Sequence, residues 1–439
     1  MNKKNAMTDI PVRAMAIALG LFVATAVHAG DNGTAANLWQ AISGGKLSLN
    51  LRYRFEHVGD DLSPGGVPLR DANASTLRTT LAYTSGEFLH LSARLEGEQV
   101  SRIFSGHFNE GTGQTSRYAT VVDPDGTELN QGYLRFTGLP HTDLRAGRQV
   151  ITYRDAPLHR FIGNVLWRQN WQTFDAVSLS NTSLPDTRIS YAWVRDVNRI
   201  FGDSAPEPLS RFRGSSHFFN VRNTAISHLA IEFHAYLLDF DNAARFSSQT
   251  WGLRLSGGYP AAPQVSLLYA AEYSRQSGYG NHPGRYNADY QLLEGGVAYK
   301  TGKLIDSLVL KADFERLSGD GSPNGAFVTI LGTNHAFQGW ADRFLVTPND
   351  GIRDYYATAI VTALGARLML VYHLLQADHM GYQYGKEFDV DLSRKFGKHF
   401  TAGAKYAGYN ADANAANLAR NGAQAADTTK FWFYCMLRF

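Results

Sequence analysis

Apolar and polar side chains alternate residue by residue over much of this chain, and the final segment shows the pattern clearly. Phe431, Phe433, Cys435, Leu437 and Phe439 share one parity, and the positions between them mostly carry charges or polar aromatic rings. Successive side chains of a β-strand point to opposite faces of a sheet. This segment is therefore predicted to be a strand with one apolar face and one polar face.

The same alternation recurs from residue 46 onward, in eighteen segments. Their lengths suit the roughly nine to eleven residues that a tilted strand needs to cross a bilayer. An even number is expected for a closed barrel whose ends both lie in the periplasm. The predicted strands lie near residues 46–56, 74–84, 87–98, 128–138, 142–152, 173–181, 186–196, 215–222, 226–238, 248–257, 264–275, 288–300, 305–316, 353–363, 366–377, 385–394, 398–409 and 427–439.

The links between these segments are alternately short and long. Tight periplasmic turns and extended external loops produce this order in outer-membrane barrels, whereas a soluble sandwich or propeller has no reason to sort its loops in this way. The sequence thus predicts an all-β, antiparallel, up-and-down transmembrane barrel. The short links include 84–87, 138–141, 181–185, 301–303 and 395–398, and the long links are 57–73, 99–127, 153–172, 197–214, 317–352 and 410–426.

A barrel of this size is expected to contain water. An open sheet edge in hydrocarbon would leave backbone groups unpaired, so the sheet has to close. Eighteen strands enclose a space too wide for their own side chains to fill. Gly106–Gly113 and residues 317–352 are candidates to fold inward and narrow this space, and the equal alternative is that they cover the outer mouth.

The domain organisation follows from the first residues and the barrel. A basic start, a short apolar stretch and small residues before Gly30 predict a signal peptide over 1–29. A short periplasmic segment over 30–45 and a barrel over 46–439 would follow. Cys435 is the only cysteine, so no intrachain disulfide is expected, and the net charge of +3 is too small to indicate a nucleic-acid partner.

The sequence does not favour an enzyme, a cofactor or a metal site. We find no nucleophile-elbow motif and no defensible Ser, His and acid arrangement on adjacent strands, which leaves a barrel-embedded hydrolase as a minor alternative. Asp123–Glu128 looks like a truncated calcium loop, but its acids have the wrong spacing and a turn is favoured. A soluble periplasmic β-protein is a weak rival, because it should have polar outward faces.

Parity also assigns the residues that would line the lumen. Arginines gather on the first five strands, and later strands carry more acids, so the two walls would differ in charge and create a transverse field. Arginine suits bidentate capture of carboxylates, which predicts passage of anionic solutes. The alternative is that these side chains only solvate the wall and pair with one another. The predicted solute path comprises Arg52, Arg54, Arg78, Arg94, Arg135, Arg145, Arg148, Arg254, Lys311, Glu96, Asp175, Asp313 and His373, with the reservation that Arg148 and Gln149 cannot both face inward without a bulge.

Several stretches carry a resemblance to a known family, namely Gly44–Lys46, Leu51–Glu56, Asp71–Arg78, Leu129–Leu134, Ala146–Gln149, Phe161–Asn164, Trp167–Asn170, Gln172–Asp175, Asp354–Tyr356 and Tyr372–His373. The chain resembles the alginate export family of outer-membrane porins over essentially its whole mature length. The resemblance implies a monomeric, eighteen-stranded, passive channel whose lumen arginines, Arg52, Arg54, Arg78, Arg94, Arg135 and Arg148, let the polyuronate leave the cell.

The expected partners are outer-membrane lipid, an anionic polysaccharide or small carboxylates as solute, and the barrel-assembly machinery, which would recognise Phe439. A general or small-carboxylate uptake porin is the alternative function.

Overall fold

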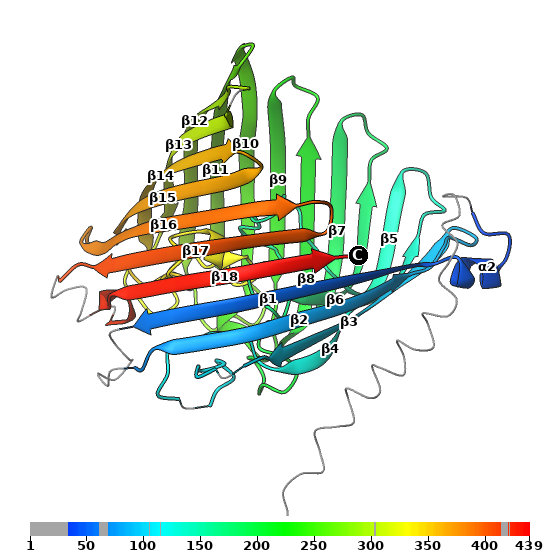
Figure 1. Cartoon of the computed structure of the whole chain (residues 1–439), viewed down its shortest axis with the longest axis horizontal. Coiled ribbons are helices and arrows are strands. Elements are labelled where there is room, and N and C mark those ends of the chain that lie inside the picture. Colours follow the sequence, from blue (N-terminus) through cyan, green and yellow to red (C-terminus); the bar gives the residue numbers. More distant parts are fainter. Residues whose placement is uncertain are drawn as a thin grey trace, which may run out of the picture.

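The computed structural model describes residues 34–60, 69–104, 106–114, 116–302, 304–413, 420 and 422–439, so the predicted signal peptide lies outside the described residues. The described chain forms one sheet of eighteen strands (Figure 1). The strands are β1 (Lys46–Asp60), β2 (Ala72–Thr84), β3 (Leu91–Arg102), β4 (Gly126–Phe136), β5 (Thr142–Gln149), β6 (Thr173–Asn181), β7 (Thr187–Asn198), β8 (Arg211–Asn223), β9 (Leu229–Leu238), β10 (Ser248–Ala262), β11 (Val265–Gly278), β12 (Asn287–Lys300), β13 (Ile305–Leu317), β14 (Ile352–Ala363), β15 (Ala366–Gln376), β16 (Gln383–Phe396), β17 (Phe400–Ala411) and β18 (Thr428–Arg438).

The sheet closes on itself, which confirms the predicted fold class. Each strand pairs antiparallel with its neighbours in sequence, and β1 also pairs with β18 from Asn50 opposite Arg438 to Asp60 opposite Thr428. The amide of Phe439 donates to the carbonyl oxygen of Leu49 and extends this seam. No free edge of the sheet is left for hydrocarbon to meet.

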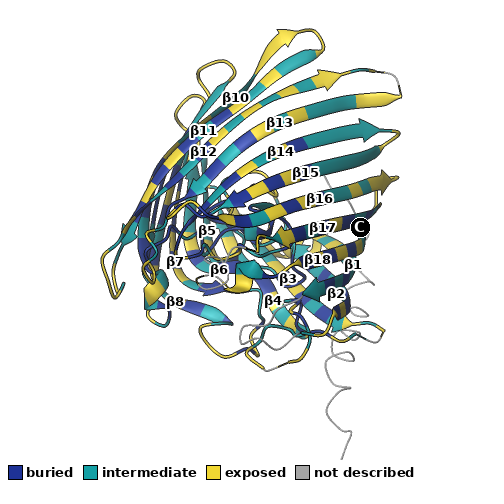
Figure 2. Ribbon diagram, turned by 90° about the vertical axis from the view of Figure 1, so that its left-hand side faces the viewer, coloured by how far each residue is buried: buried dark blue, intermediate teal, exposed yellow. Residues whose placement is uncertain are grey.

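The two faces of the wall differ as the alternation requires. On β11, Glu272 and Ser274 point inward and are buried, whereas Tyr273 between them is 48% exposed on the outer surface. Bands of buried and exposed residues run along the strands in the same way (Figure 2). The outer face offers the apolar surface that lipid contacts, because leucine and aromatic side chains occupy many of its exposed positions.

Helical structure is minor in the described chain. A short helix, α2 (Leu38–Ser43), precedes β1, and three single 3₁₀ turns, η1 (Ala244–Phe246), η2 (Asn334–Ala336) and η3 (Gly422–Ala425), lie between strands. None of the helices in the described ranges has the length and apolarity needed to span a bilayer.

Two long links enter the barrel, and we call them the first inner segment (residues 150–172) and the second inner segment (residues 318–351). They build an apolar cluster inside the lumen: Phe161 of the first packs against inward-facing Tyr236 and Tyr290 and against Phe327 of the second. The inward prediction for residues 317–352 is confirmed. The role of the first inner segment was missed.

The other predicted constriction, Gly106–Gly113, takes the alternative place at the outer mouth. The amide of Asn73 at the external end of β2 donates to the carbonyl oxygen of His107, and Asn109 forms a bridge with Thr120 of the same loop. Phe108 of this stretch packs with Val58, Ala72 and Ala74 at the external ends of β1 and β2.

Candidate functional site

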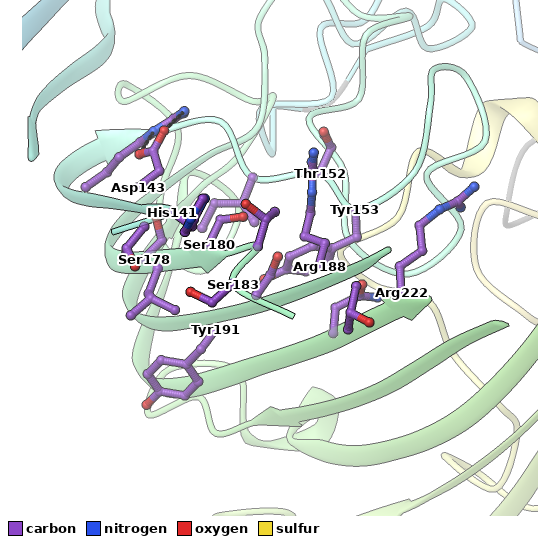
Figure 3. Close-up of a pocket in the computed structure, with 18 of the residues that line it drawn as sticks. His141, Asp143, Thr152, Tyr153, Ser178, Ser180, Ser183, Arg188, Tyr191 and Arg222 are labelled. Carbon is purple, nitrogen blue, oxygen red and sulfur yellow. Dashed lines mark hydrogen bonds and ion pairs between the residues drawn. The ribbon is translucent and has the colours of Figure 1, made fainter. Parts of the chain in front are cut away.

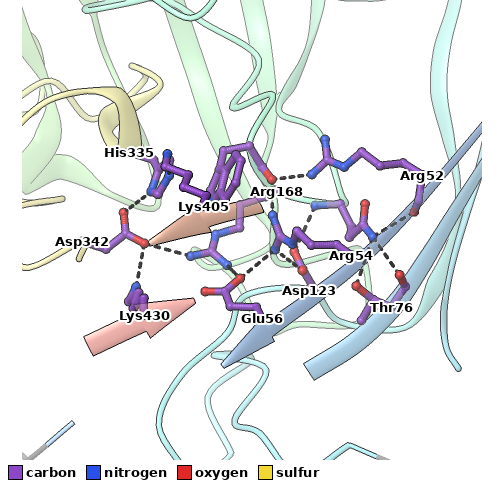
Figure 4. A network of polar contacts seen from close by, with 12 residues as sticks. Arg52, Arg54, Glu56, Thr76, Asp123, Arg168, His335, Asp342, Lys405 and Lys430 are labelled. Carbon is purple, nitrogen blue, oxygen red and sulfur yellow. Dashed lines mark hydrogen bonds and ion pairs between the residues drawn. The ribbon is translucent and has the colours of Figure 1, made fainter. Parts of the chain in front are cut away.

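The first arginines of the predicted path hold the first inner segment in place. Arg52 on β1 donates to the carbonyl oxygen of Leu166 at 2.6 Å, and both Arg52 and Arg54 donate to that of Trp167 (Figure 4). Arg54 is buried and also pairs with Asp123. These two guanidinium groups face the lumen, and their donors are occupied by the protein.

Arg168 connects both inner segments to the wall. Its Nη1 lies 3.1 Å from Glu56 Oε2 on β1, and its Nη2 lies 3.2 Å from Asp342 Oδ2 in the second inner segment (Figure 4). Lys430 on β18 approaches the same Asp342 oxygen at 2.8 Å. All four side chains are at most 6% exposed, so water screens these ion pairs little.

His335 completes this network from the second inner segment. Its Nδ1 lies 2.6 Å from Asp342 Oδ1, and its Nε2 lies 2.7 Å from the Lys405 ammonium nitrogen, which donates to it. The imidazole stacks on Trp167, with ring centroids 4.4 Å apart. Burial, together with nearby positive charge, lowers the pKa of His335 to about 3. The neutral imidazole can therefore donate to Asp342 and accept from Lys405 at the same time.

The acidic wall of the barrel also binds the inner segments. Arg154 of the first inner segment lies 2.8 Å from Glu232 Oε1 and 2.6 Å from Glu272 Oε1, and Arg160 lies 2.9 Å from Glu315 Oε1. The predicted difference in charge between the walls is present along the strands. However, Arg154 and Arg160 of the first inner segment neutralise much of the acidic wall, so this wall does not offer an unpaired row of carboxylates.

Backbone groups complete this attachment on β16. Glu387 Oε1 accepts from the amide of Ala341 at 2.6 Å, and Asp389 Oδ2 accepts from the amide of Trp340 at 3.2 Å. The second inner segment is thereby tied to β16, which lies between β13 and β1 in the closed sheet, two strands that hold the first inner segment.

Most other predicted path residues face the lumen in ion pairs. Arg78 lies 2.6 Å from Glu98 Oε2 and stacks over Trp171, with its guanidinium carbon 3.8 Å from the ring centroid. The remaining pairs are Arg94 with Glu96, Arg254 with Glu272 at 2.9 Å, Lys311 with Glu294 and with Asp313 at 3.7 Å, and His373 with Asp354 at 2.9 Å.

Arg148 and Asp175 correct the prediction, because they lie on the outer side of the wall. Alternation along β5 is regular from Arg145 to Gln149, and it is Gln149 that is buried inside. Arg148 therefore points outward at the external end of β5, where its Nε lies 2.7 Å from Asp175 Oδ1. Arg145 and Arg148 could both face inward only if a bulge lay between them, and the pairing of β5 with β6 contains no bulge.

Beside the start of the first inner segment the lumen opens into a cavity of about 1140 Å³ at the periplasmic end. Strands β4 to β8 and their short turns line this cavity. We call it the vestibule. Its lining includes five arginines and three aspartates. Arg135 and Arg145 share Asp143, at 2.8 and 3.0 Å. The five arginines are Arg135, Arg145, Arg154, Arg188 and Arg222.

Among the five arginines of the vestibule, Arg188 and Arg222 have the weakest ion pairing. They stand directly opposite each other on β7 and β8, and both are exposed (Figure 3). Within the described ranges, no carboxylate lies within 4.0 Å of Arg188, and Arg222 approaches only Glu232, at 3.9 Å. Neither was predicted, although each shares the inward parity of a buried neighbour, Ser190 or Asn220.

The Asp123–Glu128 stretch uses its acids on protein donors. Asp123 pairs with Arg54, Asp125 Oδ1 accepts from the amide of Arg102 at 2.7 Å, and Glu128 Oε1 accepts from that of Asp203 at 2.7 Å. Among the residues that the structure describes, no group of three or more His, Cys, Asp and Glu side chains could hold a metal ion.

A closed eighteen-stranded barrel with an apolar outer face, inner loops and a charged lumen defines the architecture of an outer-membrane porin. The fold is similar to that of solved structures, among them Acinetobacter baumannii OccAB2 (TM-score 0.68, 13% identity, 91% of this chain and 99% of that chain covered) and OccAB4 (0.66, 13%, 93% and 100%). Pseudomonas aeruginosa OpdK with vanillate is a further match (0.60, 13%, 90% and 98%).

These structural matches show the fold. No family model matches the chain, and a search of curated proteins finds no match. The resemblance to the alginate export family therefore has no support from these comparisons.

Proposed function

We propose that the protein is a passive outer-membrane channel for the uptake of small, carboxylate-bearing anions. The observation that carries this proposal is the pair of exposed arginines, Arg188 and Arg222, which face each other in the vestibule. Like charges placed directly opposite across two strands destabilise a sheet. A transient carboxylate between the two guanidinium groups would relieve this repulsion, and each guanidinium can bind it through two hydrogen bonds.

The inner segments favour a small solute. Arg52 fastens the first inner segment to β1, and Arg154 and Arg160 fasten it to the opposite wall. A stiff polyuronate would have to displace the buried ion pairs that hold this segment, and a small anion needs less space. OpdK, a structural neighbour, is known with vanillate, which is a small carboxylate. Small-anion uptake is therefore preferred to alginate export.

Planar-bilayer reversal potentials test the proposal. Wild-type channels should favour chloride over potassium, and the double variant Arg188→Gln with Arg222→Gln should lose much of that preference. Arg195→Gln is the matched control, because Arg195 is 75% exposed and lies on the bulge that interrupts β7. Liposome swelling then compares small carboxylates with neutral sugars of similar size and with oligouronates. Cation preference in the wild type, or equal effects of the double variant and the control, would refute the proposal.

A further inference from the structure

The short helix α2 presents an unusual apolar surface at the periplasmic end of the barrel. Its six residues include no charged side chain. Leu38 is 60% exposed, Trp39 73% and Ile42 47%. The helix lies beside the end of the barrel that carries the short turns (Figure 1). Three large apolar side chains on one short helix are a costly surface to leave in water.

Backbone contacts fix α2 against the turn between β2 and β3. Ala41, the buried residue of the helix, accepts with its carbonyl oxygen from the amide of Gly86 at 2.8 Å. The amide of Ala35 donates to the carbonyl oxygen of Glu87 at 2.8 Å. A Cβ at Gly86 would lie 3.3 Å from Ala41, so the helix and the turn are in close contact. The exposure of the apolar side chains is therefore set by a defined packing.

The helix contacts the outer, lipid-facing side of the wall. Arg78 on β2 points inward, and alternation therefore places Tyr83, five positions later, on the outer face. The Tyr83 hydroxyl donates to the carbonyl oxygen of Ile42, and the Tyr83 ring covers Gly45. The surface of α2 is thus continuous with the face of the barrel that meets lipid.

Neighbouring apolar side chains extend this surface. Leu89 in the adjoining turn is 69% exposed, and Leu91 and Leu95 on the outer face of β3 are 47% and 58% exposed. Tryptophan and tyrosine favour the level of the lipid headgroups, where an apolar ring and a polar group are both accommodated. Trp39 and Tyr83 are the residue types expected at that level.

We propose that α2 is an interfacial anchor that inserts Leu38, Trp39 and Ile42 into the headgroup region of the inner leaflet of the outer membrane. An uncharged helix lying in the plane of the interface buries its apolar side chains at little electrostatic cost. The anchor holds the β2–β3 end of the barrel at a fixed depth. This inference concerns the lipid contact of the barrel and is independent of the solute that passes.

Site-specific labelling tests the anchor in the full-length chain. In a Cys435→Ser background, Trp39→Cys carries an environment-sensitive fluorophore, and Ser183→Cys in the short β6–β7 turn carries the same label as a control. The protein is reconstituted in vesicles of phosphatidylethanolamine and phosphatidylglycerol, with iodide on both sides. Heat-modifiable gel migration establishes that each variant is folded.

The label at position 39 should emit at shorter wavelength than the control, be quenched by brominated lipids and be shielded from iodide. Equal iodide quenching at the two sites, with no effect of brominated lipids at position 39, would overturn the proposal. Energy transfer between labels at position 39 on different copies would also overturn it, because a second chain would then cover the helix. A label-free measurement guards against perturbation: Trp39→Phe should remove part of the quenching of intrinsic fluorescence by brominated lipids, and no change would count against the anchor.

Discussion

Replacing Arg168 with methionine should loosen the inner segments while leaving the barrel closed. Arg168 is the group that links Glu56 on the wall to Asp342 in the second inner segment, at 3.1 and 3.2 Å. The methionine side chain keeps much of the apolar stem and removes both ion pairs. Every strand retains its ladder of backbone hydrogen bonds, so the change acts on the lumen.

The expected size of the effect follows from the partners that remain. Removing one member of a buried ion pair costs about 3–5 kcal/mol. The lower end applies here, because Glu56 keeps Arg54 at 3.1 Å and Asp342 keeps Lys430 at 2.8 Å. A loss of about 3 kcal/mol shifts the balance between docked and undocked segments by on the order of 100-fold. Arg168→Lys should give a smaller loss, because one ammonium group cannot span both carboxylates as the guanidinium fork does.

Single-channel recording in planar bilayers measures this shift. The Arg168→Met channel should show more frequent or longer openings to a higher conductance than the wild type, and Arg168→Lys should lie between them. Arg195→Met, an exposed arginine on the β7 bulge, is the control and should behave as the wild type. If Arg168→Met shows unchanged conductance and gating, the inner segments are held in place by something other than this ion-pair network.

Three further predictions concern pH, backbone strain and salt. Burial lowers the pKa of His335 from 6.5 to about 3. The free energy that docks the inner segments should therefore not vary with pH above about 6.5, and it should fall by at most about 1.4 kcal/mol per pH unit as the pH drops toward 3. Single-channel recordings should show this loss as rising channel noise in acid. Gly147→Ala should cost about 1–3 kcal/mol in thermal unfolding of the barrel, because φ is +127° and the new methyl group would meet a carbonyl oxygen of β4, whereas Gly295→Ala in open space should cost far less. The anion preference should fall between roughly 0.1 M and 1 M salt, as the screening length shortens from about 10 Å to about 3 Å, and a salt-independent ratio would contradict an electrostatic origin.

The strands could be predicted closely, and the site only in part. Parity assigns Arg52, Arg54 and Arg78 to the inner face, but it does not reveal that Arg52 and Arg54 bind backbone carbonyls of a loop. The prediction for Arg148 was wrong, because Arg148 and Gln149 are adjacent and the register of β5 buries Gln149. Arg188 and Arg222 were within reach of the same parity argument and were overlooked.

The sequence by itself determined the number of strands, the closure of the barrel and its lipid-facing side, because each depends on alternation within a single strand and on the length of a link. Only the tertiary structure decided which loops fill the lumen and which charges stay free. Arg168 and Asp342 lie 174 residues apart, and Arg160 and Gln338 lie 178 apart. Contacts at such separations depend on the positions of loops relative to the wall, and no local pattern records them.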